Sequence, residues 1–167
     1  MKQNDYLFMT MIFLLMALTG CASGKGAATE ASAEEGQTAL REAIENQTYY
    51  VEVNQMYPMI GSPSTFITDF SVAIKGDMIK SYLPFFGRVY TATYGGDNPL
   101  SFESKIEDYH LSFDRNGKAS IKLKTASKND TYNFRIEIYP NGTTSIHVRS
   151  NYRDAMAYRG IASDKRR

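Results

Sequence analysis

The sequence has no tryptophan, two histidines and a single cysteine, Cys21, among its 167 residues. One thiol cannot form an internal disulfide, and if Cys21 is modified no thiol remains for a nucleophile or a metal site. No spacing of His, Asp and Glu suggests a metal site, and no glycine-rich loop suggests a phosphate site. We therefore expect a domain held together by packing, without a cofactor.

The apolar run that opens the chain is too short to span a membrane, because a spanning helix needs roughly 20 residues. It covers Tyr6–Leu18, which is 13 residues, and is followed by the small-residue sequence Thr19-Gly20-Cys21. A run of this length before such a cleavage site is typical of a signal peptide. We predict that residues 1–20 are a signal peptide.

A cysteine directly after Leu18-Thr19-Gly20 resembles the bacterial lipobox, in which the thiol is acylated and the signal is cut before it. We therefore predict that Cys21 is the lipid attachment residue, bearing palmitate-like chains. The alternative is an ordinary secretory peptide with a chance cysteine. Each buried CH₂ contributes about 0.8 kcal/mol, so two or three acyl chains would hold the protein on a membrane. By analogy with Gram-negative sorting, Ala22 in place of Asp predicts the outer membrane of the cell envelope.

The segment after the cysteine has the composition of a linker. Residues 21–36 are rich in Ala, Ser, Gly and Glu and contain no large apolar side chain, which predicts a flexible tether. From Gln37 to Asn46 the spacing changes, because Leu40, Ala43 and Ile44 recur at i, i+3 and i+4. This spacing predicts one short amphipathic helix.

The region 37–167 has the length of one domain, and most of it alternates between apolar and polar residues. The alternation begins near Thr48 and continues in short segments joined by turn sequences such as Lys75-Gly76-Asp77 and Pro140-Asn141-Gly142. We predict a mainly β fold, an antiparallel meander of about 8–10 strands preceded by one short N-terminal helix. The pattern leaves a sandwich and a barrel both open.

The alternation breaks at Pro84, which lacks the N–H that a strand ladder requires. Two adjacent rings follow, Phe85 and Phe86, and in an extended chain they would point in opposite directions. Gly87 permits either a positive φ or a close backbone approach. This stretch either supports the fold or forms a functional site. As a site, it predicts a ligand or partner surface made of Tyr82, Phe85, Phe86, Arg88 and Tyr90.

Three parts of the chain carry a family resemblance. They are the string SYLPFFGRVY over residues 81–90, the Gly95-Gly96 turn followed by Leu100-Ser101-Phe102, and the closing run from Arg153 to Gly160. Together they resemble domain of unknown function 4251, a family of small bacterial lipoproteins. The resemblance covers most of the mature chain and implies an exported, mostly β lipoprotein. It brings no catalytic residues to carry over.

Charge is divided unevenly along the chain. Residues 22–113 carry 6 Lys or Arg against 12 Asp or Glu, whereas residues 114–167 carry 12 against 5. Four basic residues alternate with the apolar residues of their strands and should project from the face opposite the core. They are Lys122, Lys124, Arg135 and Arg149. This face is either an ordinary solvated surface or one that meets an anionic surface.

Few residues suggest catalysis. His110 and His147 alternate with the apolar residues of their strands, which predicts surface or cross-strand roles. Glu103, Glu107 and Asp108 are close in sequence, and a pair of them would suit glycoside hydrolysis only at a defined separation. We expect that the protein is not an enzyme, and a hydrolase is the third choice.

Two hypotheses about function follow. The mature chain has 11 tyrosines, and a tyrosine side chain has a flat apolar face with a hydrogen-bonding tip, which suits either a binding surface or strand positions at a barrel rim. The first hypothesis is a cell-envelope binding module for an envelope protein, peptide, glycan or small apolar ligand. The second is a structural envelope protein that acts through protein contacts. Export excludes nucleic acid as a partner, and the membrane is a partner through the lipid on Cys21.

Overall fold

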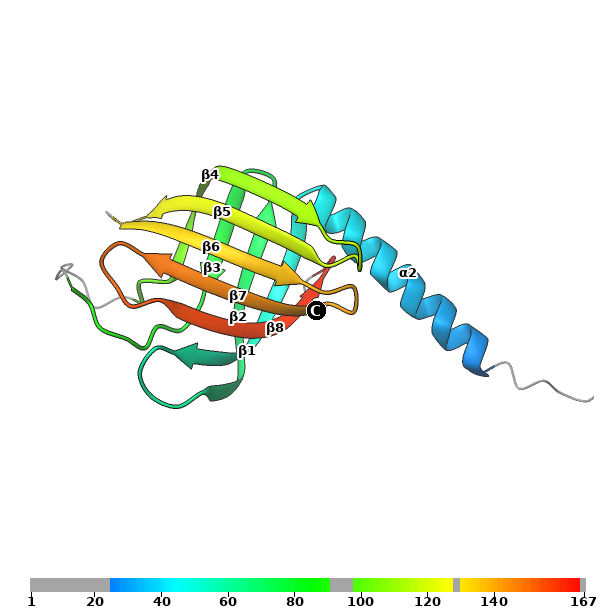
Figure 1. Ribbon diagram of the computed structural model, residues 1–167, viewed down its shortest axis with the longest axis horizontal. Coiled ribbons are helices and arrows are strands. Elements are labelled where there is room, and N and C mark those ends of the chain that lie inside the picture. The colour runs from blue at the N-terminus through cyan, green and yellow to red at the C-terminus, as the bar shows by residue number, and fades with distance from the viewer. Residues whose placement is uncertain (1–24, 91–97, 128–129, 166–167) are drawn as a thin grey trace, which may run out of the picture. The chain divides into compact units, whose positions relative to one another are not determined.

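The computed structural model describes residues 25–90, 98–127 and 130–165. The predicted signal peptide and Cys21 lie outside the described residues. Within these ranges, one helix precedes eight strands (Figure 1). They are α2 (Lys25–Glu45), β1 (Thr48–Pro58), β2 (Ser64–Lys75), β3 (Met78–Tyr82), β4 (Ser101–Phe113), β5 (Ala119–Ser127), β6 (Asp130–Ile138), β7 (Thr143–Ser150) and β8 (Met156–Ser163).

The strands form a closed antiparallel barrel in sequence order, with β8 paired to β1. In Figure 1, β4–β8 form the near wall and β2 and β3 lie behind them. The predicted mainly β meander is confirmed, and of the two architectures left open the barrel is correct. Closure gives every strand a hydrogen-bonded neighbour on both sides.

Alternate side chains of each strand fill the barrel. In β5, the inward residues Ala119, Ile121, Leu123 and Thr125 are buried, while the outward residue Lys122 is exposed. The buried side chains of all eight strands belong to one continuous hydrophobic core. The outward positions are therefore the ones available for function.

The helix is longer than the sequence predicted. The predicted helix over Gln37–Asn46 is the last part of α2, and Leu40, Ala43 and Ile44 are buried in the core as its spacing requires. The flexible-tether interpretation is wrong from Lys25 onward, where α2 already begins. Alanine and glutamate are strong helix formers, so a segment poor in large apolar residues also fits an exposed helix. Within the described residues, no helix is long and apolar enough to cross a membrane.

The seam between β1 and β8 closes around a glycine. The pairing register shifts between Val53 and Gln55, and Gly160 lies opposite Val53. A Cβ on Gly160 would overlap the Glu52 carbonyl oxygen and come within 3.0 Å of Val53 Cα. Only glycine permits the two backbones to approach this closely.

Candidate functional site

The loop after β3 begins where Pro84 ends the strand, and both of its ends are tied to the barrel. The Leu83 N–H donates to the Leu100 carbonyl at 3.2 Å, and the Asn98 amide donates to the Leu83 carbonyl at 2.6 Å. The buried Tyr158 hydroxyl, from β8, donates to the Pro84 carbonyl at 2.6 Å. Burial raises the pKa of Tyr158, which keeps this donor protonated.

The two rings of the loop have different environments. Phe85 is partly buried and packs against the hydrophobic core, whereas Phe86 is 62% exposed. Phe86 lies beside the hairpin between β1 and β2, because a Cβ on Gly61 would be 3.6 Å from its ring. One ring therefore contributes to the fold and the other lies at the surface.

The next residues of the loop are held by Asp154, just before β8. The Arg88 N–H donates to Asp154 Oδ2 at 2.9 Å, and the Tyr90 hydroxyl donates to Asp154 Oδ1. These donors lower the pKa of Asp154, and the bond to the carboxylate raises the pKa of Tyr90. Gly87 is required here for close approach, because its Cβ would meet Asp154 Cβ at 3.0 Å.

A buried ion pair lies next to this loop. Arg153 Nη1 is 2.7 Å from Asp130 Oδ2, and the two side chains are only 9% and 1% exposed. The Ser150 hydroxyl also donates to Asp130 Oδ2, at 2.6 Å. Between the loop and the barrel a void of only about 10 Å³ remains. Among the described residues, the space between residues 83–90 and the barrel is therefore too small for a ligand.

The predicted surface residues thus have separate roles. Phe85 packs inward, Arg88 and Tyr90 are bound through Asp154, and Tyr82 packs on Phe70 with ring centroids 5.3 Å apart. Beside Arg88, the side chains that the loop leaves exposed are Phe86, Val89 and Tyr90. We call this surface the apolar end patch; it consists of Met59, Ile60, Phe86, Val89, Tyr90 and Tyr152.

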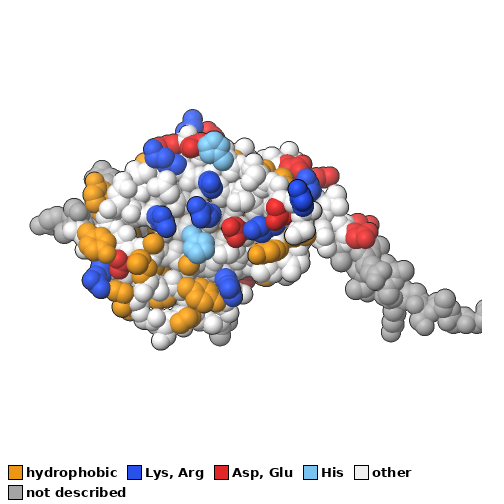
Figure 2. Space-filling model, viewed as in Figure 1, with side chains coloured by type: hydrophobic (Ala, Val, Ile, Leu, Met, Phe, Trp, Pro, Cys, Tyr) orange, Lys and Arg blue, Asp and Glu red, His pale blue; other side chains and the backbone are white. Residues whose placement is uncertain are grey.

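A larger hollow lies on the outside of the barrel, and the sequence did not predict it. It has a volume of about 870 Å³ and is formed by outward side chains of β4–β8 together with Tyr57, Pro58 and Met59. This volume lies within the range of roughly 300–1,000 Å³ that is typical of ligand sites. We call it the outer-face groove. Figure 2 shows Lys, Arg and His side chains gathered over this face, with hydrophobic side chains along its margin.

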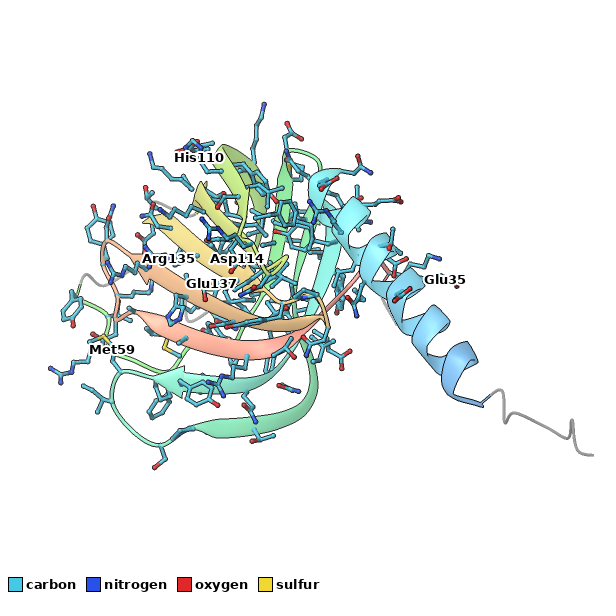
Figure 3. The ribbon with its side chains drawn as sticks, turned by 45° about the vertical axis from the view of Figure 1, so that its right-hand side comes forward. Glu35, Met59, His110, Asp114, Arg135 and Glu137 are labelled. Carbon is cyan, nitrogen blue, oxygen red and sulfur yellow. The ribbon has the colours of Figure 1, made fainter. Side chains whose placement is uncertain are left out.

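The strand register aligns the basic side chains across the groove. Lys122 of β5 lies opposite His110 of β4 on one side and Arg135 of β6 on the other. Arg135 in turn lies opposite His147 of β7. One residue pair further along, Asn133 separates Lys124 from Arg149. Figure 3 shows His110, Arg135 and Glu137 on the same side of the sheet, with Met59 near its margin.

The acidic residues of this face do not neutralise all the basic side chains aligned across the groove, which we call the basic row. Asp108 pairs with His110 at 3.1 Å, and Glu137 is 3.8 Å from Lys118. Lys124 pairs with Glu107 at 3.1 Å. Three of the exposed cations that line the groove form no ion pair with any described residue; they are Lys122, Arg135 and Arg149. Like charges opposite each other in a sheet destabilise it, so this row costs stability in the free protein.

The other residues that the sequence singled out, the basic residues, the histidines and the candidate catalytic carboxylates, lie at the surface. The outward projection of the four basic residues is confirmed, and both histidines lie at the surface. Glu103 pairs with Lys80 at 3.5 Å on the exposed surface, and Glu107 pairs with Lys124. Within the ranges that the structure describes, no three His, Cys, Asp or Glu residues are grouped to hold a metal ion.

The fold and the groove define a small closed β-barrel with a hollow, basic outer face. Residues 31–162 match the family described as domain of unknown function (DUF4251). The chain belongs to this family. Its fold is similar to the crystal structure of a DUF4251 family protein from Bacteroides eggerthii DSM 20697, with a TM-score of 0.61 and 14% identity over 80% of this chain and 90% of that chain. No curated protein matches the sequence.

The sequence pointed to the loop but missed its partners. Asp130 and Arg153 form the buried ion pair next to the loop, and Asp154 holds its backbone. Arg153 and Asp154 belong to the closing run that carries the family resemblance, which is the only sequence signal for them. The groove had a clearer signal in the alternating basic residues of β5–β7.

Proposed function

We propose that the protein is a lipid-anchored binding protein of the bacterial outer membrane, and that it holds its ligand in the outer-face groove. The observation that carries this proposal is the row of unpaired cations lining a hollow of about 870 Å³. Because like charges in register weaken a sheet, a ligand that supplies negative charge would remove a cost that the free protein bears.

The two other candidate locations support ligand binding less well. The barrel interior is filled by the hydrophobic core. The loop over residues 83–90 has its backbone bound to the barrel, with a void of only about 10 Å³ beneath it. The groove is larger than the described hollow of about 300 Å³ beside α2, and its side chains can recognise a charged ligand.

The pairing of the acidic residues in the groove with basic side chains favours binding over catalysis. The two carboxylates that line the groove, Asp108 and Glu137, each lie beside a basic side chain. The groove offers positively charged and hydrogen-bonding side chains, which suit recognition.

The anchor is tested by mass spectrometry of the protein extracted from membranes. The expected product begins at Cys21, lacks residues 1–20 and carries acyl chains. The Cys21→Ser variant should be absent from the outer-membrane fraction. An unmodified wild-type protein in the soluble fraction would contradict the anchor.

The groove is tested by two tryptophan substitutions on the outer face. Asn133→Trp fills the groove, whereas Glu103→Trp places the same ring on the outward face of β4 away from it. Envelope extract is added to ¹⁵N-labelled protein, and amide shifts are recorded. We expect shifts in β5–β7 that Asn133→Trp abolishes and Glu103→Trp preserves. Shifts confined to residues 84–90, or none in β5–β7, would contradict the proposal.

The apolar end patch favours a second candidate, a structural envelope protein that acts through protein contacts. Large apolar side chains from the β1–β2 hairpin and from the loop lie exposed there, with Met59 at 69% and Tyr90 at 66%. Exposed apolar side chains gathered at one place often mark a protein contact. If this candidate is correct, Ile60→Ser and Phe86→Ser would abolish the protein contact, while Asn133→Trp would leave that contact unchanged.

A further inference from the structure

We propose that the ligand of the outer-face groove is an acidic oligosaccharide, a short sugar chain carrying carboxylate or sulfate groups. This inference rests on the proposed function and specifies its ligand class.

The charge of the ligand follows from the unpaired cations. Lys122 and Arg135 lie opposite each other on neighbouring strands, and Arg149 lies on the next strand, two residues along from the partner of Arg135. Arginine binds carboxylate and sulfate oxygens through two parallel N–H groups, and lysine adds a point charge. Several anionic groups spaced along one molecule would meet all three cations, whereas a single small anion would meet only one or two.

The closed barrel argues against an extended peptide as the ligand. Peptides that bind to β proteins commonly add a strand to a free sheet edge, where backbone hydrogen bonds supply affinity. Here the strands β5 to β8 beneath the groove are each paired on both sides. Recognition in the groove must therefore come from side chains alone, which suits a ligand whose own polar groups point outward.

The remaining lining of the groove suits a sugar. Asn133 offers both a donor and an acceptor for hydroxyl groups, and it lies between the cations Lys124 and Arg149. At the margin lies Tyr57, a half-buried aromatic side chain. Its hydroxyl donates to Gln55 Oε1 at 2.8 Å, and the Arg159 guanidinium lies 5.3 Å from its ring centroid. A sugar ring has an apolar C–H face as well as hydroxyl groups, so this mixed lining matches it.

The shape of the site argues against a membrane surface. The cations line a hollow whose margin includes Tyr57, Pro58 and Met59. A flat layer of headgroups would meet this margin first, whereas a narrow soluble chain can enter the hollow.

The test uses the mature chain with Cys21→Ser, so that its own lipid does not affect binding, and isothermal titration calorimetry. The probes are an oligogalacturonate, a sulfated heparin oligosaccharide, a neutral malto-oligosaccharide, poly-glutamate and vesicles containing phosphatidylglycerol. We expect saturable binding of at least one acidic oligosaccharide. The neutral sugar, the peptide and the vesicles should bind at least about tenfold more weakly, a factor that separates specific recognition from charge alone.

Matched variants locate the binding. Arg135→Gln and Arg149→Gln should each weaken acidic oligosaccharide binding by about tenfold, the usual order for loss of a charge-assisted contact. Arg115→Gln removes the same charge from the turn after β4, outside the groove, and should leave affinity unchanged. Arg135→Gln should unfold at the same or a higher temperature than the parent protein, because it removes a like charge opposite Lys122.

Four results would overturn the proposal. They are no binding of either acidic oligosaccharide, equal binding of poly-glutamate, binding to vesicles alone, and unchanged affinity in both groove variants. The amide-shift experiment separates this failure from failure of the proposed function. If extract still shifts β5–β7 while acidic oligosaccharides do not bind, the groove is a binding site for another class of ligand. If neither has an effect, both proposals are wrong.

Discussion

Arg88 and Asp154 exchange two hydrogen bonds, although 66 residues separate them in the sequence. The Arg88 N–H donates to Asp154 Oδ2 at 2.9 Å, and the Asp154 N–H donates to the Arg88 carbonyl at 3.1 Å. Val89 and Arg153 form an isolated antiparallel bridge between the same two segments. The loop after β3 is therefore attached to the start of β8 like a short additional strand pair.

We predict that Asp154→Asn destabilises the protein. The amide has one acceptor oxygen in place of two, so it cannot accept hydrogen bonds from both the Arg88 N–H and the Tyr90 hydroxyl as the carboxylate does. The midpoint of urea unfolding should fall. Asp164→Asn, at an exposed position, is the matched control and should leave the midpoint unchanged. Equal midpoints for the two variants would show that Asp154 does not hold the loop.

The same carboxyl group predicts a pH dependence. The hydrogen bond from Tyr90, followed by that from Arg88, lowers the pKa of Asp154 below its usual value of 3.8. A lowered folded-state pKa stabilises the protein above the unfolded-state value, and this contribution is lost as pH falls through the folded-state value. Between about pH 5 and pH 2, wild type should lose more stability than Asp154→Asn. Parallel pH profiles of the urea midpoint would contradict this prediction.

The two rings of the loop should respond differently to alanine. Phe85→Ala should cost about 3 kcal/mol of unfolding free energy, at the low end of the range for aromatic core residues because Phe85 is only partly buried. Phe86→Ala should change it by less than about 0.5 kcal/mol, as exposed substitutions usually do. Urea unfolding of both variants measures the difference. Similar losses would show that Phe86 also supports the fold.

Two glycines should give opposite results in the same experiment. Gly160→Ala should destabilise the barrel by about 3 kcal/mol or more, because the new methyl group would overlap the Glu52 carbonyl. Gly36→Ala, in α2, meets nothing within 4 Å and should stabilise the protein by about 0.5–1 kcal/mol. A tolerated Gly160→Ala would mean that the seam between β1 and β8 can open locally.

The sequence was sufficient to predict the strands and their faces. The period of two placed Lys122 and Arg135 outward, and the break at Pro84 placed the loop correctly. Closure of the barrel was not predictable, because it depends on a register shift beside Val53 and on the backbone approach at Gly160. Neither feature changes the local alternation of residues.

The candidate site was only partly predictable. Alternation showed that the basic residues of β5–β7 share one face, but the groove also needs Tyr57 and Met59 from the distant β1–β2 hairpin. The sequence also suggested that the loop residues Arg88 and Tyr90 were available to a ligand, and this too depended on contacts that only the tertiary fold creates. The exposed Arg88 and Tyr90 are bound by Asp154, whose position beside them depends on the tertiary fold.

The central claim, that the ligand lies in the outer-face groove, is tested most directly by photo-crosslinking in living cells. A benzophenone amino acid replaces Asn133 in the groove, Phe86 in the apolar end patch, or Glu103 on the outward face of β4. We predict a discrete adduct at Asn133, absent at Glu103 and lost when Arg135→Gln and Arg149→Gln are added. A discrete adduct at Phe86 with none at Asn133 would contradict the claim and favour the structural alternative.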